Sequence, residues 1–232
     1  GDADRIGAVD ERGEILWGDR LMIVYARDIL TQRPGTTFIS EVKASQCLYD
    51  DIAAKGGRPI MWKTGHSLMK AKLKAESAVL AGEMSGHMFF ADRYFGFDDA
   101  IYASCRLVEI LAKTKRSLSS LVADLPQTTV TPEIRVDCPD TLKFQLVDQV
   151  RTQLAAYLAE GQPVGASNLR MRELVTIDGV RAIFEDGWGL IRASNTQPAL
   201  VLRFEAPSPA RLDVIRATIE TELAQARRVL ST

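Results

Sequence analysis

The 232-residue sequence has few of the residues that most often carry metal or redox chemistry. It contains only two histidines and three cysteines. Cys47, Cys105 and Cys138 are widely spaced and form no Cys-x-x-Cys pair. The sequence therefore predicts neither a disulfide framework nor a zinc site.

The sequence also lacks an excess of charge and a long apolar run. Its 29 Lys+Arg and 30 Asp+Glu give a net charge of -1, which removes the non-specific electrostatic attraction typical of nucleic-acid binders. No apolar run approaches the roughly 20 residues that span a bilayer, and the first residues do not resemble a signal peptide. Hydrophobic residues make up 46%, enough for ordinary folded cores. We expect a monomeric, cytoplasmic protein that binds neither nucleic acid nor membrane.

Strand-like and helix-like segments alternate through the first half of the chain. Residues 36–42, 58–62, 78–81 and 88–90 are β-rich, and helical segments of about ten residues lie between most of them. This alternation predicts an α/β domain with a mixed sheet between helices. The sequence DLPQTT at residues 124–129 interrupts the pattern, and we place a domain boundary there.

The order of segments changes after this boundary. A strand near residues 130–136 leads to a long helix that carries Leu146, Val150, Leu154 and Leu158 on one face. Successive strands follow at residues 174–177, 180–184, 189–192 and 200–204, and then a final helix. This order predicts an α+β domain, an antiparallel sheet with helices on one face.

The first 17 residues read as a strand, a tight turn and a second strand. A lone hairpin is marginally stable in water, so we expect these strands to belong to a sheet with further members upstream. The first residue is Gly rather than Met. We therefore expect the chain to be a fragment of a longer protein.

Both histidines lie in glycine-rich loops, KTGHS (residues 63–67) and GEMSGH (residues 82–87). Loops carried by a sheet commonly hold ligand-binding groups, so His66 and His87 are candidate site residues. In an extended backbone Glu83 and Ser85 would point the same way, which suits binding of neighbouring sugar hydroxyls. The alternative is a polar turn that satisfies its own backbone.

Three further segments carry charged side chains that could bind a phosphate or a cation that accompanies it. Asp2 and Asp4, followed by Arg5, are typical of a hard cation held by carboxylate oxygens, and the alternative is a solvated acidic turn. The sequence RASNTQP (residues 192–198) combines one guanidinium with hydroxyl and amide donors and is the strongest phosphate candidate. Lys43, just after an apolar strand, can supply a second cation. The alternatives are a purely structural Ser-Asn-Thr turn and a solvated lysine.

Six motifs, GDADR, EVKAS, KTGHS, GEMSGH, FGFDD and RASNTQP, occur in this order along the chain. In sequence and spacing they resemble the α-D-phosphohexomutases, most closely the bacterial phosphomannomutase/phosphoglucomutase group. The resemblance implies residues 1–14 as the end of domain 2, residues 15–126 as the sugar-binding domain 3, and residues 127–232 as the phosphate-binding domain 4. It also implies that the first two domains precede this chain in the full protein.

The resemblance further implies an isomerase that moves phosphate between O1 and O6 of glucose or mannose through a phosphoserine and a hexose 1,6-bisphosphate. Mg²⁺ is the implied cofactor, and hexose phosphates are the implied substrates. The implied site residues are the metal ligands Asp2 and Asp4, the catalytic residues Arg5, Lys43 and His87, and the substrate contacts His66, Glu83, Ser85, Arg192, Ser194, Asn195 and Thr196. Lys43 and His87 are candidates for proton transfer.

Two departures from the family pattern limit this expectation. The family's serine loop, of the type Thr-Ala-Ser-His-Asn-Pro, is absent, and the metal loop Asp-Gly-Asp-x-Asp-Arg begins here at its Gly. We therefore predict that this chain alone binds Mg²⁺ poorly and has no mutase activity. A non-catalytic sugar-phosphate-binding module, or a purely structural or interaction protein, are the alternatives.

Overall fold

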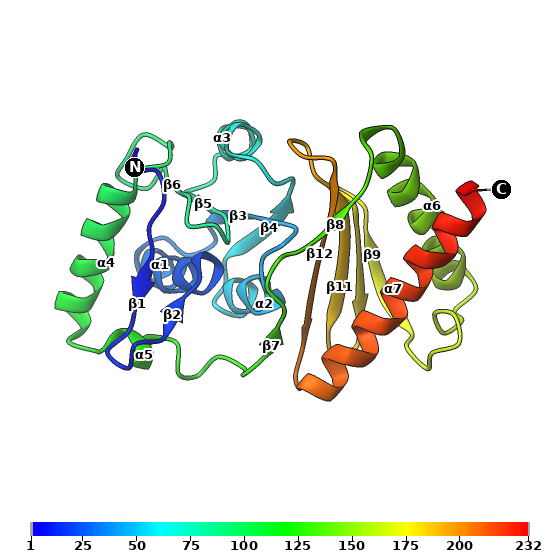
Figure 1. Cartoon of the computed structure of the whole chain (residues 1–232). Helices are drawn as coiled ribbons and strands as arrows, with labels where there is room; N and C mark the ends of the chain where they lie inside the picture. Colours follow the sequence, from blue (N-terminus) through cyan, green and yellow to red (C-terminus); the bar gives the residue numbers. More distant parts are fainter. Residues whose placement is uncertain (1, 232) are drawn as a thin grey trace. The chain divides into compact units, whose positions relative to one another are not determined.

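A computed structural model describes residues 2–231 and divides the chain into two compact units, Gly1–Pro126 and Gln127–Thr232 (Figure 1). Residues 1 and 232 are not among the described residues. Among residues 2–231, no helix combines the length and the apolar character needed to cross a membrane.

The first unit is built on a mixed four-stranded sheet. Its strands are β3 (Thr37–Glu41), β4 (Arg58–Trp62), β5 (Leu80–Gly82) and β6 (Met88–Phe90). The order is β4-β3-β5-β6; β3 is parallel to β4 and β5, and β6 is antiparallel to β5. The helices are α1 (Gly18–Gln32), α2 (Gln46–Ala54), α3 (His66–Ala75), α4 (Ala100–Thr114) and the one-turn α5 (Leu118–Leu121). The predicted α/β domain is confirmed; α5 was not anticipated.

Helices cover both faces of this sheet. Phe38 and Leu80 pack into a core with α1, α2, α4 and α5. The next residue of each strand, Ile39 and Ala81, points to the opposite face and packs against α3. Burial on both faces explains why these strands appear in the sequence as continuous apolar runs rather than as alternating patterns.

The connections of this sheet change direction at the carboxyl ends of two neighbouring strands. From β3 the chain passes through α2 to β4 on one side, and then through α3 to β5 on the other side of β3. The carboxyl ends of β3 and β5 therefore flank a topological switch point, the usual place for ligands in open α/β sheets.

The opening hairpin belongs to the first unit. Its strands β1 (Ala8–Val9) and β2 (Ile15–Leu16) pair with each other and, within residues 2–231, with no other strand. Ala8 and Leu16 are buried in the core that contains α1 and α4. The expected further strands of its sheet therefore do not occur in the described part of the chain.

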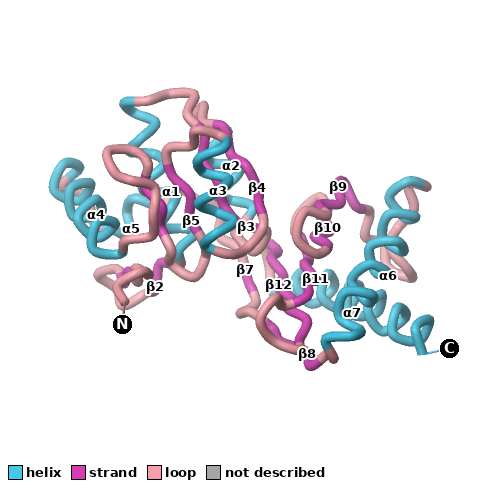
Figure 2. The backbone as a smooth tube through the Cα atoms, turned by 90° about the horizontal axis from the view of Figure 1, so that it is seen from above, coloured by secondary structure: helices cyan, strands magenta, loops and turns pink. Residues whose placement is uncertain are grey.

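The second unit is an antiparallel sheet with two long helices. Its strands are β7 (Thr129–Val130), β8 (Ile134–Asp137), β9 (Met171–Val175), β10 (Val180–Phe184), β11 (Trp188–Ala193) and β12 (Ala199–Ala206). The order is β7-β12-β11-β10-β9, and β8 also pairs with β12. Helices α6 (Asp140–Ala159) and α7 (Pro209–Ser231) lie on one face of the sheet (Figure 1) and contact each other, crossing in the view of Figure 2. The predicted α+β domain is confirmed.

Two strands of this unit differ from their predicted bounds. The single strand expected near residues 130–136 is two strands, because Pro132 has no N–H to continue a ladder. Thr131 maintains the edge with its own side chain, since its Oγ1 accepts a hydrogen bond from the Phe204 N–H at 3.1 Å. The strand expected at residues 174–177 begins and ends earlier, at Met171–Val175, because Asp178 and Gly179 lie in the turn to β10.

Candidate functional site

The predicted site residues of the first unit gather where β3, β4 and β5 end. Glu41 closes β3, and Lys43 follows two residues later. The loop after β4 leads to His66 at the start of α3, and the turn after β5 begins at Glu83. The parallel arrangement of these strands brings all three segments to one edge of the sheet.

The segment from Glu83 to His87 is a tight turn between β5 and β6, which agrees with the predicted glycine-rich loop but not with the extended backbone considered for Glu83 and Ser85. The Glu83 N–H donates to the His87 carbonyl at 2.9 Å, and the Gly86 N–H donates to the Glu83 carbonyl at 3.0 Å. Glu83 and Ser85 nevertheless meet, because the Ser85 hydroxyl donates to Glu83 Oε2 at 3.3 Å. The predicted pairing of carboxylate and hydroxyl is therefore present, but the turn produces it rather than strand alternation.

Gly86 brings the N-terminal segment against this turn. Its φ is +100°, and an added Cβ would lie 2.4 Å from the Ile6 carbonyl oxygen. The Ile6 N–H in turn donates to the Gly86 carbonyl at 3.1 Å, and Arg5 forms an isolated β-bridge with His87. Only glycine permits this close approach, which places the Asp2–Arg5 segment beside the turn.

Glu83 and His87 form the centre of the site. The Glu83 carboxylate is buried; its Oε1 accepts a hydrogen bond from the Gly65 N–H at 2.8 Å, and its Oε2 lies 2.7 Å from His87 Nδ1. Burial would raise the pKa of Glu83, but the bonds to His87 and Gly65 outweigh it and lower that pKa. The same bond to Glu83 raises the pKa of His87 against the opposing effect of burial, and Asp4 contributes in the same direction. The pair therefore favours a carboxylate beside an imidazolium.

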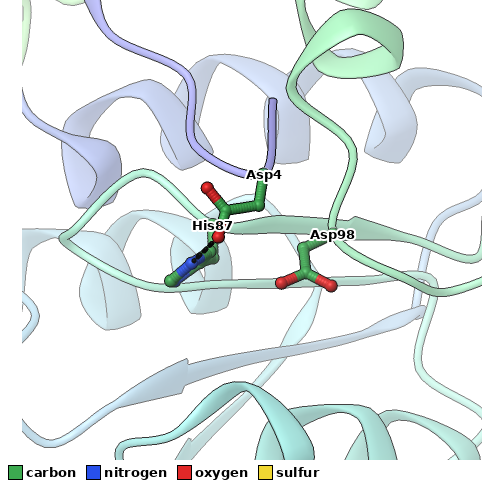
Figure 3. Close-up of side chains that lie close together, drawn as sticks. All are labelled: Asp4, His87 and Asp98. Atoms are coloured by element: carbon green, nitrogen blue, oxygen red, sulfur yellow. Dashed lines mark hydrogen bonds and ion pairs between the residues drawn. The ribbon is translucent and has the colours of Figure 1, made fainter. Parts of the chain in front are cut away.

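A second carboxylate contacts the other ring nitrogen of His87 (Figure 3). Asp4 Oδ2 lies 3.2 Å from His87 Nε2, and this hydrogen bond is the main cause of the lowered pKa of Asp4. The ligand atoms of Asp4, His87 and Asp98 lie within 4.8 Å of one another. The two carboxylates offer the oxygen ligands that Mg²⁺ prefers, whereas the imidazole nitrogen suits softer metals. Asp4 and Asp98 are therefore candidate oxygen ligands for a magnesium ion, which would compete with the Lys70 ammonium, 3.2 Å from Asp98 Oδ1.

The other two predicted residues of the N-terminal segment are more exposed. Asp2 is exposed and lies outside the cluster of Asp4, His87 and Asp98. Arg5 is also exposed, and its Nε lies 3.5 Å from Asp4 Oδ1. Both side chains are therefore accessible to a ligand or an ion at this edge of the unit.

Lys43 and His66 are the remaining predicted site residues of the first unit. Lys43 is 8% exposed, and its ammonium lies 3.4 Å from Glu41 Oε2. The ring centroids of His66 and His87 are 6.3 Å apart. The structure therefore brings Asp4, Lys43, His66, Glu83, Ser85 and His87 to the same edge of the first unit.

The predicted residues of the second unit lie at the end of β11 and in the turn that follows. Arg192 is buried, and its Nε and Nη2 donate to the two carboxylate oxygens of Asp178 at 3.2 and 3.3 Å. Ser194 Oγ accepts hydrogen bonds from the backbone N–H groups of Thr196 and Gln197. The side chains of Asn195 and Thr196 are exposed. The turn thus combines a fixed guanidinium with exposed polar side chains.

Sequence reasoning missed four residues that organise these sites: Glu41, Thr64, Asp98 and Asp178. Each is a polar side chain that contacts or lies near a predicted site residue. For Glu41 the sequence does hold a signal, since a carboxylate stands there at the carboxyl end of an apolar strand. Such a group needs a partner because burial of an unpaired charge is costly. The identity of the partner depends on the tertiary structure.

The chain resembles one family along most of its length. Residues 17–129 match "Phosphoglucomutase/phosphomannomutase, alpha/beta/alpha domain III", and residues 133–222 match the C-terminal domain of the same family. The chain is 47% identical over 223 residues to a phosphomannomutase/phosphoglucomutase of Pseudomonas putida, covering 96% of this chain and 45% of the relative. It is 44% identical to a phosphoglucomutase of Neisseria gonorrhoeae, covering 93% of this chain and 44% of that protein.

A solved structure agrees with these sequence matches. The crystal structure of a phosphoglucomutase/phosphomannomutase family protein from Burkholderia thailandensis superimposes with a TM-score of 0.85 at 42% identity. That match covers 98% of this chain and 45% of the solved chain. The chain therefore spans about half the length of the relatives that it matches.

Proposed function

The chain belongs to the phosphoglucomutase/phosphomannomutase family, and from this premise we propose that it is the hexose-phosphate-binding part of a phosphohexomutase. The proposed enzyme moves phosphate between O1 and O6 of glucose or mannose. A phosphoserine outside these 232 residues gives its phosphoryl group to the bound hexose phosphate, and the hexose 1,6-bisphosphate then returns the other phosphate to the serine. A monomeric, cytoplasmic protein remains a prediction from the sequence.

The observation that carries this proposal is the preformed set of polar groups around Glu83. A sugar offers neighbouring hydroxyls that both donate and accept hydrogen bonds. The Glu83 carboxylate accepts such bonds, and the Ser85 hydroxyl beside it both donates and accepts. Because Gly65 and His87 already hold the carboxylate, a sugar would meet it in a fixed orientation.

Proton transfer is the second requirement of the reaction. The sugar hydroxyl that attacks a phosphoryl group must lose its proton, and the serine oxygen that leaves must gain one. Lys43 and His87 lie at the edge of the sheet where the sugar would bind, and we assign them these roles. Arg5, exposed beside Asp4, provides positive charge on the side of the phosphoryl donor.

Charge neutralisation is the third requirement. Asp2 and Asp4, with Asp98 as an adjacent carboxylate, would hold Mg²⁺, which when bound neutralises charge on the phosphoryl oxygens. In the second unit, Arg192, Ser194, Asn195 and Thr196 would bind the phosphate that is not being transferred. The guanidinium suits this task because its planar donors match phosphate oxygens in pairs.

Calorimetry on the 232-residue chain tests the proposal directly. We expect glucose 1-phosphate or mannose 1-phosphate to bind, and free glucose to bind at least about tenfold more weakly because it lacks the anion. Glu83→Gln and Arg192→Ala should each weaken binding of the phosphorylated sugar. An unchanged affinity in both variants contradicts the assignment of these residues.

Activity measurements separate the enzyme from the non-catalytic binding module. The chain alone should show no mutase activity and only weak Mg²⁺ binding. Addition of the N-terminal half of the Pseudomonas putida relative should restore turnover if the chain is part of a mutase. Binding without any restored turnover favours the module, and robust turnover of glucose 1-phosphate by the chain alone contradicts the proposed division of the site.

A further inference from the structure

Glu41 is the most deeply buried acidic residue at the edge of the sheet that carries the site. Its exposed fraction is 0%, although it stands at the carboxyl end of β3, where the site opens. Burial dominates its environment and raises the pKa of its carboxyl group against the opposing effect of Lys43. A buried carboxylate is costly and is tolerated only with good partners. The hydrogen-bond and ion-pair partners of Glu41 therefore indicate what this carboxylate does in the fold.

Each oxygen of this carboxylate contacts a different loop of the site. Oε2 accepts a hydrogen bond from the Thr64 hydroxyl at 2.7 Å, and Oε1 accepts one from the Met84 N–H at 3.0 Å. The Lys43 ammonium lies 3.4 Å from Oε2. The Tyr49 hydroxyl donates to the backbone carbonyl of Glu41 at 2.7 Å, which fixes the residue itself.

These contacts connect the three segments that carry the proposed sugar-binding residues. Thr64 lies two residues before His66, Met84 directly follows Glu83, and Lys43 is itself a site residue. A second bond, from the Gly65 N–H to Glu83 Oε1 at 2.8 Å, joins two of the same segments. Two buried carboxylates thus hold the loops after β4 and β5 together, and Glu41 also contacts Lys43.

Stability by itself is a poor explanation for this arrangement. Apolar side chains of similar volume often replace a buried ion pair without loss of stability. An apolar side chain at position 41 would leave the Thr64 hydroxyl, the Met84 N–H and the Lys43 ammonium without this acceptor. What the carboxylate supplies is the relative position of three loops.

We propose that Glu41 is a positioning residue that holds Lys43, the loop before His66 and the turn at Glu83 in the geometry that binds a hexose phosphate. The nature of the ligand rests on the proposed function. The effect on the loops does not, because it is measurable on the chain without ligand.

Three variants of the 232-residue chain test this role. Glu41→Ala removes every contact of the carboxylate. Glu41→Gln retains one oxygen for the Met84 N–H and an amide that can donate to the Thr64 hydroxyl, but it removes the charge beside Lys43. Asp92→Asn is the matched control, because Asp92 is also a buried carboxylate of the first unit, and it pairs with Arg106 at 3.0 Å away from the site.

The first measurement is the backbone amide NMR spectrum of each variant without ligand. Glu41→Ala should shift the Met84 and Gly65 amide resonances strongly, and Glu41→Gln should restore them close to their original positions. Asp92→Asn should leave both resonances unchanged at a similar loss of melting temperature. Unchanged Met84 and Gly65 resonances in Glu41→Ala overturn the proposal.

The second measurement is the Kd for glucose 1-phosphate or mannose 1-phosphate. Glu41→Ala should weaken binding by about tenfold or more, Glu41→Gln by about threefold, and Asp92→Asn by less than about twofold. If Glu41→Ala does not fold, the Kd of Glu41→Gln is compared with the Kd of Asp92→Asn. A larger loss of affinity in Glu41→Gln supports the proposal. Equal losses in Glu41 and Asp92 variants of equal stability overturn the proposal.

The two measurements also separate this inference from the proposed function. If the unaltered chain binds neither hexose phosphate, the proposed function fails, and the amide resonances still decide whether Glu41 positions the loops. If the unaltered chain binds and the Glu41→Ala affinity is unchanged, the proposed function stands and the inference about Glu41 fails.

Discussion

The two units hold their polar site residues in different ways. In the first unit, Glu41 and Glu83 are buried, and their hydrogen bonds cross between loops that follow different strands. In the second unit, Ser194 bonds to the backbone of its own turn, and Arg192 pairs with Asp178 of a neighbouring turn. Lys143 on α6 and Arg135 on β8 also donate hydrogen bonds to Gln197 in the turn after β11. The first site is thus joined by buried carboxylates, whereas the second combines bonds within its own turn with basic donors from neighbouring elements.

This difference matches what each site is proposed to bind. Sugar hydroxyls are neutral, and a hydrogen-bonding site recognises them only if its own groups are fixed beforehand. A phosphate carries enough charge to order exposed side chains such as Asn195 and Thr196 on binding, once a guanidinium anchors it. The comparison therefore predicts that substitutions act across loops in the first unit and within one turn in the second.

The buried acids extend the comparison. Glu41 has hydrogen-bond partners on both carboxylate oxygens, whereas Glu222 on α7, buried in the second unit, has no hydrogen-bond partner on Oε2 among residues 2–231. Burial raises the pKa of both carboxyl groups. The first acid thus connects parts of a site, and the second is a local cost to stability.

The largest expected effect tests how the turn beside Arg192 is built. At Gly179 φ is +83°, and an added Cβ would lie 2.4 Å from the Ile191 carbonyl oxygen and 2.5 Å from Arg192 Cβ. Gly179→Ala should lower the free energy of unfolding by about 3 kcal/mol. The control is Gly13→Ala, where φ is +84° but nothing lies within 4 Å of the added Cβ, with an expected loss of about 1 kcal/mol. Equal losses by urea denaturation would show that crowding at Arg192 is unimportant.

The second prediction concerns the anchoring guanidinium. Arg192→Lys should weaken binding of a hexose phosphate by about tenfold, because an ammonium cannot pair with Asp178 and with phosphate oxygens through a planar fork. Arg211→Lys, which alters a surface pair with Asp186, is the matched control and should leave the affinity unchanged. Isothermal titration calorimetry measures both. Similar losses of affinity in the two variants would show that Arg192 contributes only its positive charge and not the geometry of its guanidinium.

The third prediction concerns the pH dependence of stability. A carboxyl group whose pKa is higher in the folded than in the unfolded state stabilises the fold at low pH, and stability falls as pH rises from the usual value of about 4.3 through the raised one. Glu222→Gln should remove this decline and raise the free energy of unfolding at neutral pH by about 1 kcal/mol.

Denaturation curves between pH 4 and pH 8 measure this effect. The control is Glu220→Gln on the same helix, which alters a pair with Arg216 at 2.8 Å and should leave the slope with pH unchanged. A Glu222→Gln variant that keeps the original slope would show that another group causes it.

The smallest expected effects lie within the turn of the second unit. Asn195→Ala and Thr196→Ala should change the free energy of unfolding by less than about 0.5 kcal/mol, because both side chains are exposed. Each should nevertheless weaken hexose-phosphate binding by about threefold. Ser194→Ala should instead lower the free energy of unfolding by about 1 kcal/mol, because the Ser194 hydroxyl accepts hydrogen bonds from two backbone N–H groups. Thermal and calorimetric measurements on the same samples separate the two classes.

Local sequence predicted the type of nearly every element but not all boundaries. Apolar runs marked β3, β5 and β6, and Asp99 caps α4 by accepting a hydrogen bond from the Tyr102 N–H at 2.8 Å. Pro132 divided a predicted strand because its missing N–H interrupts the edge ladder. The predicted glycine-rich loop at residues 83–87 is a tight turn, but the sequence did not indicate that the turn, rather than an extended backbone, brings Glu83 and Ser85 together.

The sequence by itself determined that one unit is α/β and the other α+β, and it supplied the residue types that we propose bind a sugar and a phosphate, because periodicity and motif spacing are local properties of the chain. Only the tertiary structure decided that Glu41 contacts Thr64, Met84 and Lys43, that Asp98 lies beside Asp4, and that Asp178 holds Arg192. These partners come from segments that meet only after folding. A buried charge takes whichever donors the folded chain brings within hydrogen-bonding distance, and no local pattern records that choice.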